Sequence, residues 1–416
     1  METPMQRRRL IAGMAAAAAA ALVLTGCSSG SSAGGSQSKD SLTWSMWIAG
    51  KEDQAAWQKV ADTVKSEDGI TLTIQGAPFE NYFTKLSAQL SGGSAQCVVS
   101  MQSLRAANYT SSLLPLDDLA EKAGLDLSAF DSTALNGMKV DGKLYGLPYD
   151  TGPIMMFYNK DMLKAAGVSD PEPGWTVDDF EKTGAALKAK GDTMFGSTVG
   201  DLNLESMVYG YNGGRVVTTK GELDPTNGDF AKGLDWLGSL VKDGYATQAS
   251  SDTSQPGNDF ASGKVAMYTD GPWSLISQKA KVKFDLGVTT LPSGTSGPST
   301  FAAGSGFGIS KQCKYPEQAF KAVETMTSEK VLTSLAEQGR AFPARTAAQG
   351  AWYSSAGIDG AETALKAALA KSSPLLGNKQ SDQLSQLFTQ YALQAVNGQT
   401  SGKEAMSSIA SQLGTQ

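Results

Sequence analysis

Strand-like and helix-like patterns alternate along residues 42–99, and this alternation limits the fold more than any other feature. Residues 42–47 and 70–74 alternate apolar with polar side chains, as strands do, and 97–99 form a short apolar run. Between them, residues 57–64 and 79–90 carry apolar side chains at helical spacing. The order β-α-β-α-β predicts a parallel sheet with helices on both faces. Ligands of such sheets bind outside the carboxyl ends of the strands, where Trp47 and residues 101–105 are expected.

Later segments show the same mixture of elements. Trp175 is followed by Thr176, Asp179 and Phe180, a spacing that predicts a capping box with Trp175 packed on Phe180, so Trp175 is interpreted as structural. Residues 260–267 predict a turn entering a strand, and 270–273 read Asp-Gly-Pro-Trp, a turn with a proline suited to the first turn of a helix. The C-terminal part is expected to be mostly helical.

Composition excludes several classes of protein. The 416-residue chain contains no histidine, which rules out Ser-His-Asp and Cys-His catalysis and removes the commonest zinc ligand. Its net charge is −6, and because the residues before Cys27 carry +2, the remainder is near −8. This mild acidity argues against a nucleic-acid partner. No phosphate-binding loop is present, and we expect neither a metal nor a cofactor.

The N-terminus predicts export and a lipid anchor. Arg7, Arg8 and Arg9 precede an apolar, alanine-rich run, which together describe a signal peptide over residues 1–26. Residues 24–27 read Leu-Thr-Gly-Cys and resemble the lipobox of bacterial lipoproteins, which implies cleavage before Cys27 and diacylglycerol on its sulfur. The alternative is an ordinary export signal with a chance cysteine. The expected location is the extracytoplasmic face of the cell membrane.

Beyond Cys27, residues 27–40 form a Ser/Gly-rich segment that predicts a flexible linker. About 375 residues then remain, too many for one core and suited to two lobes. Two further cysteines, Cys97 and Cys313, are either disulfide-bonded, as is common outside the cell, or buried free thiols. The residues alone leave both possibilities open.

Several motifs together resemble the sugar-binding lipoproteins of ABC importers, relatives of the maltose-binding protein. The resemblance covers about residues 42–413, and its most specific pieces are residues 142–148 continuing through 157–161, and 260–273. Residues 287–292 and 339–345 add to it. Each of these motifs is weakly specific by itself, and the resemblance rests on their order and spacing.

The resemblance implies an α/β fold of two lobes, each a mainly parallel sheet flanked by helices, joined by crossing strands. The first lobe would comprise residues 41–150 and 288–340, and the second 151–287 and 341–416. Cys97 and Cys313 would lie in one lobe, which favours the disulfide. The implied function is capture of a sugar between closing lobes and its delivery to ABC permease subunits in the membrane, by a monomer without turnover.

A sugar site needs flat aromatic platforms and planar polar groups that exchange hydrogen bonds with hydroxyls. The strand ends and the resemblance together suggest nine ligand-binding residues: Trp47, Tyr82, Gln102, Arg105, Asp150, Asp201, Asn203, Trp273 and Arg345.

Each candidate has a structural alternative. Trp273 stacks on ligand or packs in the core, and Asp150 accepts from a hydroxyl or caps a turn. Tyr82 shares its helix with Phe83, and one of the two must face the core. The loop of Gln102 and Arg105 follows residues 96–99, which read Gln-Cys-Val-Val rather than the common Pro-Asp-Val-Val. A salt bridge or a helix cap explains Arg345 equally well, and Trp352 either stacks or packs.

Two rival functions remain open. A carbohydrate enzyme would pair Asp150 with Asp201 or Glu205, although no local motif supports such a pair. The same fold could instead bind a polyamine, a metal chelate or a peptide. The lack of histidine argues against naked transition metals, and an aromatic-plus-amide lining argues for sugars.

Overall fold

A computed structural model describes residues 37–48, 50–295, 297 and 299–415. The predicted signal peptide, Cys27 and most of the predicted linker lie outside the described residues. The described residues belong to one structural unit. Among the residues that the structure describes, no helix combines the length and the apolar character needed to cross a membrane.

The first sheet has five strands in the order β2-β1-β3-β13-β6. Strands β1 and β2 are parallel with Trp44 opposite Ile74, β3 is also parallel to β1, and β13 is antiparallel to β3. The strand bounds are β1 Ser41–Trp47, β2 Thr71–Ala77, β3 Val98–Gln102, β6 Leu147–Pro148 and β13 Ser305–Ile309. The predicted β-α-β-α-β order is confirmed. We call the residues packed around this sheet the first lobe.

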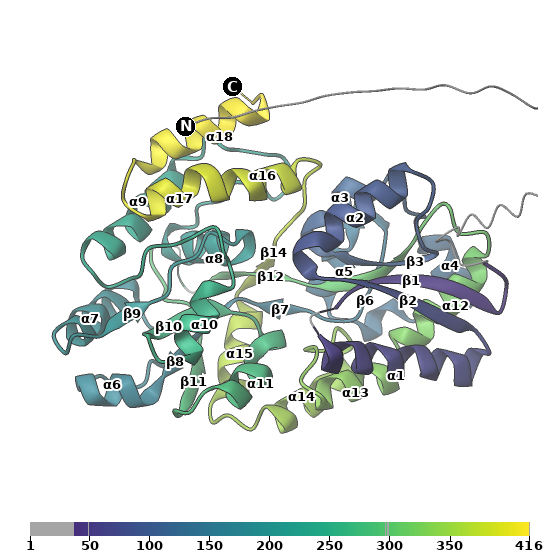
Figure 1. The fold of residues 1–416 in the computed structure, drawn as a ribbon, viewed down its shortest axis with the longest axis horizontal. Helices are drawn as coiled ribbons and strands as arrows, with labels where there is room; N and C mark the ends of the chain where they lie inside the picture. The colour runs from purple at the N-terminus through teal and green to yellow at the C-terminus, as the bar shows by residue number, and fades with distance from the viewer. Residues whose placement is uncertain (1–36, 49, 296, 298, 416) are drawn as a thin grey trace, which may run out of the picture. The chain divides into compact units, whose positions relative to one another are not determined.

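Helices cover both faces of the five-stranded sheet (Figure 1). Along β1, Leu42, Trp44 and Met46 face a core that includes α1 and α12, because alternate strand residues point to the same side. On the opposite side, Val99 and Met101 of β3 pack with the apolar face of α2. The helix bounds are α1 Lys51–Asp68, α2 Phe79–Ser91, α3 Ala106–Tyr109, α4 Asp117–Ala123, α5 Ser132–Gly137, α12 Pro316–Met326 and α13 Glu329–Glu337.

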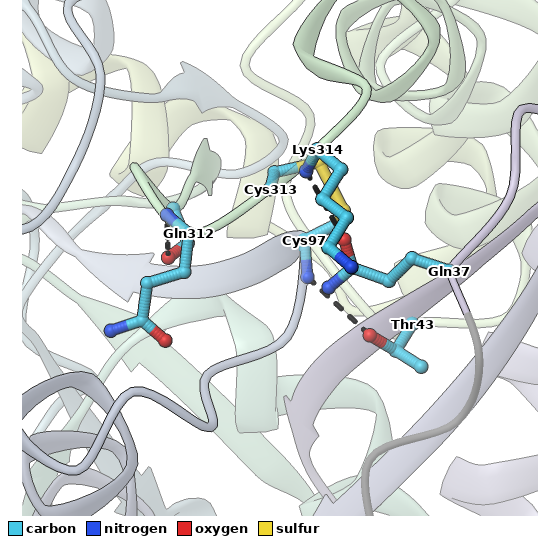
Figure 2. The surroundings of a disulfide bond; sticks show 7 residues. Gln37, Thr43, Cys97, Gln312, Cys313 and Lys314 are labelled. Carbon is cyan, nitrogen blue, oxygen red and sulfur yellow. Dashed lines mark hydrogen bonds between the residues drawn. A yellow bond between two sulfur atoms is a disulfide. The ribbon is translucent and has the colours of Figure 1, made fainter.

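A disulfide joins Cys97 and Cys313 in this lobe (Figure 2). Cys97 directly precedes β3, and Cys313 follows β13, the antiparallel neighbour of β3. Nearby, the Cys97 amide donates to Thr43 Oγ1 at 3.4 Å, and the Lys314 amide donates to Gln37 Oε1 at 3.1 Å. The bond therefore fastens two neighbouring strands that are 216 residues apart in the sequence.

The second sheet has four strands in the order β11-β8-β10-β9, and the residues packed around it form the second lobe. Strand β8 separates two cores, since Met156 and Tyr158 face one and Met155 and Phe157 the other. The strand bounds are β8 Met155–Asn159, β9 Thr193–Phe195, β10 Val265–Asp270 and β11 Leu286–Thr289. β8 falls on the apolar run Ile154–Tyr158, a pattern typical of a buried strand, with a shift of one residue.

Helices make up much of the remainder of the second lobe (Figure 1). The predicted capping box at α7 is confirmed, because the Asp179 amide donates to Thr176 Oγ1 and the Thr176 amide donates to Asp179. Trp175 packs edge-on against Phe180 with centroids 5.6 Å apart. The bounds are α6 Lys160–Ala166, α7 Val177–Lys188, α8 Asp201–Asn212, α9 Gly228–Lys242, α10 Gln255–Ala261, α11 Pro272–Lys281, α14 Gln349–Ala356, α15 Ala361–Ala370, α16 Ser381–Leu387, α17 Leu393–Val396 and α18 Gly402–Leu413.

The chain passes between the sheets at residues 148–153, 303–305 and 340–344, which we call the crossing segments. Two of these segments contribute to a three-stranded sheet in the order β14-β12-β7. Its strands are β7 Gly152–Pro153, β12 Thr300–Ala303 and β14 Ser372–Pro374. The Thr151 amide donates to the Phe342 carbonyl at 3.0 Å, and the Ala344 amide donates to the Tyr149 carbonyl at 3.0 Å. The crossing segments are thereby hydrogen-bonded to one another.

Candidate functional site

A cavity of about 450 Å³ is lined by both lobes and by the crossing segments. Residues that follow strands of the first lobe supply one wall, and the N-termini of α8 and α11 supply another, as expected for ligand sites of α/β sheets. The lining comprises Trp47, Phe79, Gln102, Tyr149, Asp150, Thr198, Gly200, Asp201, Leu202, Asn203, Thr253, Ser254, Asp270, Trp273, Ala303, Gly304, Ser305 and Arg340.

A second hollow of about 530 Å³ lies at residues 168–175 and the adjoining face of α7. One loop and one helix supply its whole lining, so nothing converges on it from distant parts of the sequence. The 450 Å³ cavity is the stronger candidate because its walls come from separate lobes. Within the described residues, no cluster of Cys, Asp and Glu side chains is arranged to hold a metal ion.

Aromatic side chains form one side of the cavity. Trp47 ends β1 and packs edge-on against Phe79 and Tyr82, with centroids 5.7 Å and 5.2 Å apart. Phe79 begins α2, and its side chain is 42% exposed. An exposed aromatic ring in a cavity wall offers an apolar surface to a ligand, and Trp47 supports that ring from the side.

Trp273 lies at the N-terminus of α11, directly after a proline in the first turn. Its ring lies over Gly271, where any Cβ would approach the ring to within 2.2 Å. A Cβ on Gly152 of the crossing segment would likewise collide with Pro272. Two glycines thus make the space that lets the indole lie against the backbone while part of it lines the cavity.

Asp150 lies where the chain leaves the first sheet, and its carboxylate accepts a hydrogen bond from the Ser305 amide. Burial raises the pKa of Asp150 to about 7, opposed by the bond from Ser305 and by the charge of Arg340. A carboxyl group in this state titrates near neutral pH. Asp150 therefore joins two crossing segments and lines the cavity at the same time.

The second lobe contributes Asp270 and Asn203. Asp270 ends β10 and accepts from the Gly271 amide at 2.7 Å, and burial raises the pKa of its carboxyl. Asn203 donates through Nδ2 to the Thr269 carbonyl at 3.0 Å, which fixes its side chain at the cavity wall. Both side chains keep an oxygen that a ligand hydroxyl can approach.

Arg340 is the one cationic residue of the cavity lining. Its guanidinium forms an ion pair with Asp53 of α1, and its Cζ lies 5.5 Å from the centroid of the Trp57 ring. The side chain of Asp53 is only 6% exposed, so the charge of Arg340 is largely compensated within the protein. Three carboxyl groups, those of Asp150, Asp201 and Asp270, also belong to the lining.

Six of the nine predicted residues line the cavity: Trp47, Gln102, Asp150, Asp201, Asn203 and Trp273. They come from β1, the end of β3, a crossing segment, α8 and α11. The structure brings these separate parts of the sequence together at one site.

Tyr82 and Arg345 do not line the cavity, and other protein groups accept the hydrogen bonds that their side chains donate. Tyr82 is 1% exposed, and its hydroxyl donates to the carbonyls of Ser45 and Ser100. Burial therefore raises the pKa of Tyr82 above its usual range. Arg345 donates through Nε to the Thr327 carbonyl at 2.6 Å and lies over the Phe130 ring. Trp352, for which stacking on ligand was an open alternative, is fully buried in the core.

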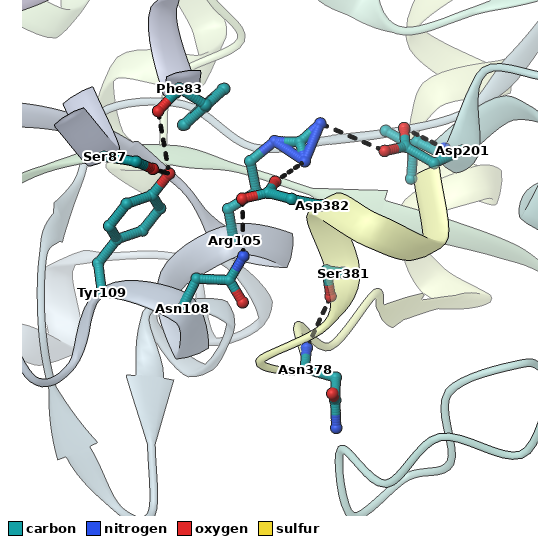
Figure 3. Close-up of polar contacts among 10 residues, drawn as sticks. Phe83, Ser87, Arg105, Asn108, Tyr109, Asp201, Asn378, Ser381 and Asp382 are labelled. Carbon is teal, nitrogen blue, oxygen red and sulfur yellow. Dashed lines mark hydrogen bonds and ion pairs between the residues drawn. The ribbon is translucent and has the colours of Figure 1, made fainter. Parts of the chain in front are cut away.

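Arg105 is also absent from the cavity lining. Its guanidinium instead contacts the carboxylates of Asp201, at 3.4 Å, and Asp382, at 2.7 Å (Figure 3). Asp201 belongs to α8 and lines the cavity, so Arg105 contacts a cavity residue without lining the cavity itself.

Sequence reasoning missed Phe79, Asp270 and Arg340. Asp270 was visible in the Asp-Gly-Pro-Trp motif, directly before the turn that carries Trp273. Arg340 lies in the 339–345 segment, in which Arg345 was the predicted ligand contact. Phe79 shares its helical face with Tyr82 and Phe83, and the pattern does not reveal which ring reaches the cavity.

Comparison with known proteins identifies the relatives of the chain. The model of the family "Bacterial extracellular solute-binding protein" matches residues 59–367. A maltooligosaccharide ABC transporter solute-binding lipoprotein of Streptococcus pneumoniae is 26% identical over 364 residues, which span 84% of this chain and 82% of the relative.

Solved structures share the fold. An ABC substrate-binding protein of Listeria monocytogenes, in complex with cycloalternan, aligns with a TM-score of 0.80 at 22% identity over 90% of this chain and 99% of its own. The GacH receptor of Streptomyces glaucescens, solved unliganded and with acarbose, aligns with a TM-score of 0.76 at 24% identity over 90% and 97%. These likenesses support the predicted two-lobed α/β architecture.

Proposed function

This chain belongs to the family of bacterial extracellular solute-binding proteins, and on that premise we propose that it captures a sugar between its two lobes and delivers it to an ABC permease. The cavity would hold the sugar, and Trp47, Gln102, Asp150, Asp201, Asn203 and Trp273 would contact it. Phe79 and Asp270 join this set. We propose that the first lobe comprises residues 41–150 and about 305–340, and the second residues 151–304 and 341–416. The boundary proposed from the resemblance moves from 288 to about 305, because β11 belongs to the second sheet and Phe301 to the second-lobe core.

One observation carries this proposal: the cavity combines aromatic rings with carboxylate and amide groups from opposite walls. Sugars have apolar C–H faces and hydroxyl rims, so rings at Trp273 and Phe79 suit the faces while Asp270 and Asn203 suit the hydroxyls. A volume of about 450 Å³ falls within the usual size of small-molecule sites.

The charges favour a neutral sugar over an anionic solute. Three carboxyl groups line the cavity, of which Asp150 is only partly ionised at neutral pH because its pKa is about 7, and the guanidinium of Arg340 is already paired with Asp53. A phosphate ester would meet this acidic lining without an uncompensated cation to bind it. The names of relatives agree with a sugar, since they include a maltooligosaccharide-binding lipoprotein and a receptor solved with acarbose.

Capture requires the lobes to move about the crossing segments. A sugar that contacts both walls favours the arrangement in which the lobes are together, because each wall alone leaves part of it in water. We propose that the sugar leaves chemically unchanged. Asp150 and Asp201 are each held by a protein group, Ser305 and Arg105, and this argues against their use as an acid–base pair.

We further propose that a lipid on Cys27 anchors the protein to the extracytoplasmic face of the cell membrane, where it meets the permease subunits as a monomer. The lipobox-like residues 24–27 support the anchor, and the pneumococcal relative is itself named a lipoprotein. Two acyl chains would give stable membrane attachment. The Ser/Gly-rich residues that follow Cys27 would allow the lobes to reach the permease.

Calorimetric titration of the purified full chain tests the proposal. The detergent must have no sugar headgroup, and the solutes are maltose, maltotriose, other oligosaccharides, spermidine and glycerol 3-phosphate. We expect at least one sugar to bind and to change the tryptophan fluorescence. Trp273→Ala should weaken binding about tenfold through loss of the stacked ring.

Lys182→Ala provides the control, because this lysine is 77% exposed on α7 and does not line the cavity. Binding of spermidine or glycerol 3-phosphate in preference to every sugar would overturn the proposed solute class. Release of shortened oligosaccharides after overnight incubation would overturn the proposed lack of turnover.

A further inference from the structure

The segment that follows β3 in the first lobe reaches into the second lobe. Gln102 lines the cavity, and Leu104, two residues later, is 4% exposed within the second-lobe core. Gly377 lies so close to this segment that a Cβ there would approach the Leu104 carbonyl oxygen to within 2.4 Å. The backbones of residues 104–105 and 377 are therefore in direct contact across the lobes.

Arg105 continues this contact with charge (Figure 3). Its Nη1 lies 2.7 Å from Asp382 Oδ1 in the first turn of α16, and its Nη2 lies 3.4 Å from Asp201 Oδ2 in the first turn of α8. Asn108 of α3 donates through Nδ2 to the second oxygen of Asp382 at 2.9 Å. Two residues of the first lobe thus hold both oxygens of Asp382.

The surroundings make this ion cluster stronger than an ordinary surface pair. The Arg105 side chain is 11% exposed and its Cζ lies 4.7 Å from the centroid of the Phe83 ring, whereas Asp201 and Asp382 are 23% and 37% exposed. Charged hydrogen bonds screened from water exceed the small contribution of exposed ion pairs. Asp201 also lies at the positive end of the α8 dipole.

We propose that Arg105 is a positioning residue that clasps the two lobes at the edge of the cavity. This inference rests on the proposed function. Arg105 holds the Asp201 carboxylate at the cavity wall, and its bond to Asp382 forms only when the lobes are together. Arg105 thereby slows release of the solute without contacting it, because loss of a contact specific to the closed arrangement acts mainly on dissociation.

The first readout needs no ligand. Nitroxide labels at Lys122→Cys in the first lobe and Lys182→Cys in the second, whose lysine side chains are 71% and 77% exposed, report the distance between lobes by pulsed electron resonance in the full chain. Arg105→Met, which keeps an aliphatic side chain against Phe83, should shift the distribution toward longer distances. Arg215→Met is the matched control, since its guanidinium stacks on Tyr209 of α8 and on Phe301, within one core.

The second readout is the rate of maltotriose release in stopped-flow fluorescence. Arg105→Met and Asp382→Asn should each release it about tenfold faster, equivalent to about 1.4 kcal/mol. The double variant should be slower than the product of the two single effects predicts, because both single variants remove the shared Arg105–Asp382 interaction. Melting temperatures of the variants without sugar verify that each remains folded.

The outcomes separate the two proposals. Unchanged distances in Arg105→Met, or additive rates in the double variant, would overturn the clasp. If the wild-type protein binds no sugar, the proposed function fails while the label distances still decide whether Arg105 holds the lobes together. A shift as large in Arg215→Met would show a general loosening of the fold and would also overturn the clasp.

Discussion

Breaking the disulfide between Cys97 and Cys313 should lower the stability of the first lobe measurably. The bond closes a loop of 216 residues that includes every strand of the second sheet. In the unfolded chain a cross-link of this length removes much conformational freedom, and the loop-closure relation gives about 5 kcal/mol at 25 °C. Measured native disulfides typically contribute about 2–4 kcal/mol, and we take about 4 kcal/mol for this one.

This free energy corresponds to a small but measurable shift in melting temperature. With an unfolding entropy of roughly 2 cal/mol/K per residue over about 380 residues, each degree is equivalent to about 0.8 kcal/mol. Loss of about 4 kcal/mol therefore lowers the melting temperature by about 5 °C. The ends of the loop remain together in the folded state, because the Ser310 amide donates to the Cys97 carbonyl at 3.0 Å and β3 pairs with β13.

Calorimetric melting with and without a phosphine reductant measures this shift. The double variant Cys97→Ala/Cys313→Ala is the control, because it has no disulfide to reduce and its melting temperature should not respond. Comparing each protein with itself removes the effect of the cavity that the buried Cys97 side chain would leave. Mass spectrometry verifies that the reductant frees both thiols of the wild-type protein. If the melting temperature of that reduced protein equals the value without reductant, the argument from loop closure is refuted.

Two further predictions concern stability. The pKa of Asp150 in the folded protein, about 7, exceeds the ordinary value of 3.8. Protonated Asp150 therefore contributes its full share to the free energy of unfolding below about pH 4, and this contribution is lost as the pH rises through 7. Asp150→Asn should reduce this dependence by up to about 4 kcal/mol in denaturant unfolding, and a slope as steep as that of the wild type between pH 5 and 8 would contradict it. Burial also raises the pKa values of Asp270 and Glu205, so part of the slope is expected to remain. Thr176→Ala should cost about 1 kcal/mol through loss of the α7 cap, and an unchanged denaturation midpoint would disprove this.

Local patterns predicted much of the fold because they depend on neighbouring residues. The alternation along residues 42–47 and the helical spacing of 57–64 gave β1 and α1, and the Thr176–Asp179 spacing gave the start of α7. The position of β13 between β3 and β6 depends instead on pairing across about two hundred residues. No local periodicity encodes such a pairing.

The sequence predicts that a residue lines the cavity when the position of its backbone alone places it there. It does not predict this when the direction of a long side chain decides. Trp47 and Gln102 line the cavity because strand ends meet at one edge of a parallel sheet. Arg105 has a long side chain whose partner, Asp382, is 277 residues away, so its direction follows from tertiary contacts. On α2, Phe79 rather than Tyr82 lines the cavity, because two backbone carbonyls accept hydrogen bonds from the Tyr82 hydroxyl and hold its side chain in the core.

The hydrogen-bonding state of the cavity argues for a solute that brings donors. Asp150 accepts one hydrogen bond, from the Ser305 amide, whereas Asp201 and Asp270 each have two protein partners. Each carboxyl oxygen can accept more than one hydrogen bond, so acceptor capacity remains at all three residues. Gln102 Oε1 is buried and has no hydrogen-bond partner among the described residues. A buried acceptor left without a donor costs about 1–3 kcal/mol, so a ligand rich in hydroxyls gains by supplying several donors at once. The phosphate group of an ester adds negative charge and acceptors but few donors, so it would pair with fewer of these atoms than a sugar of similar size.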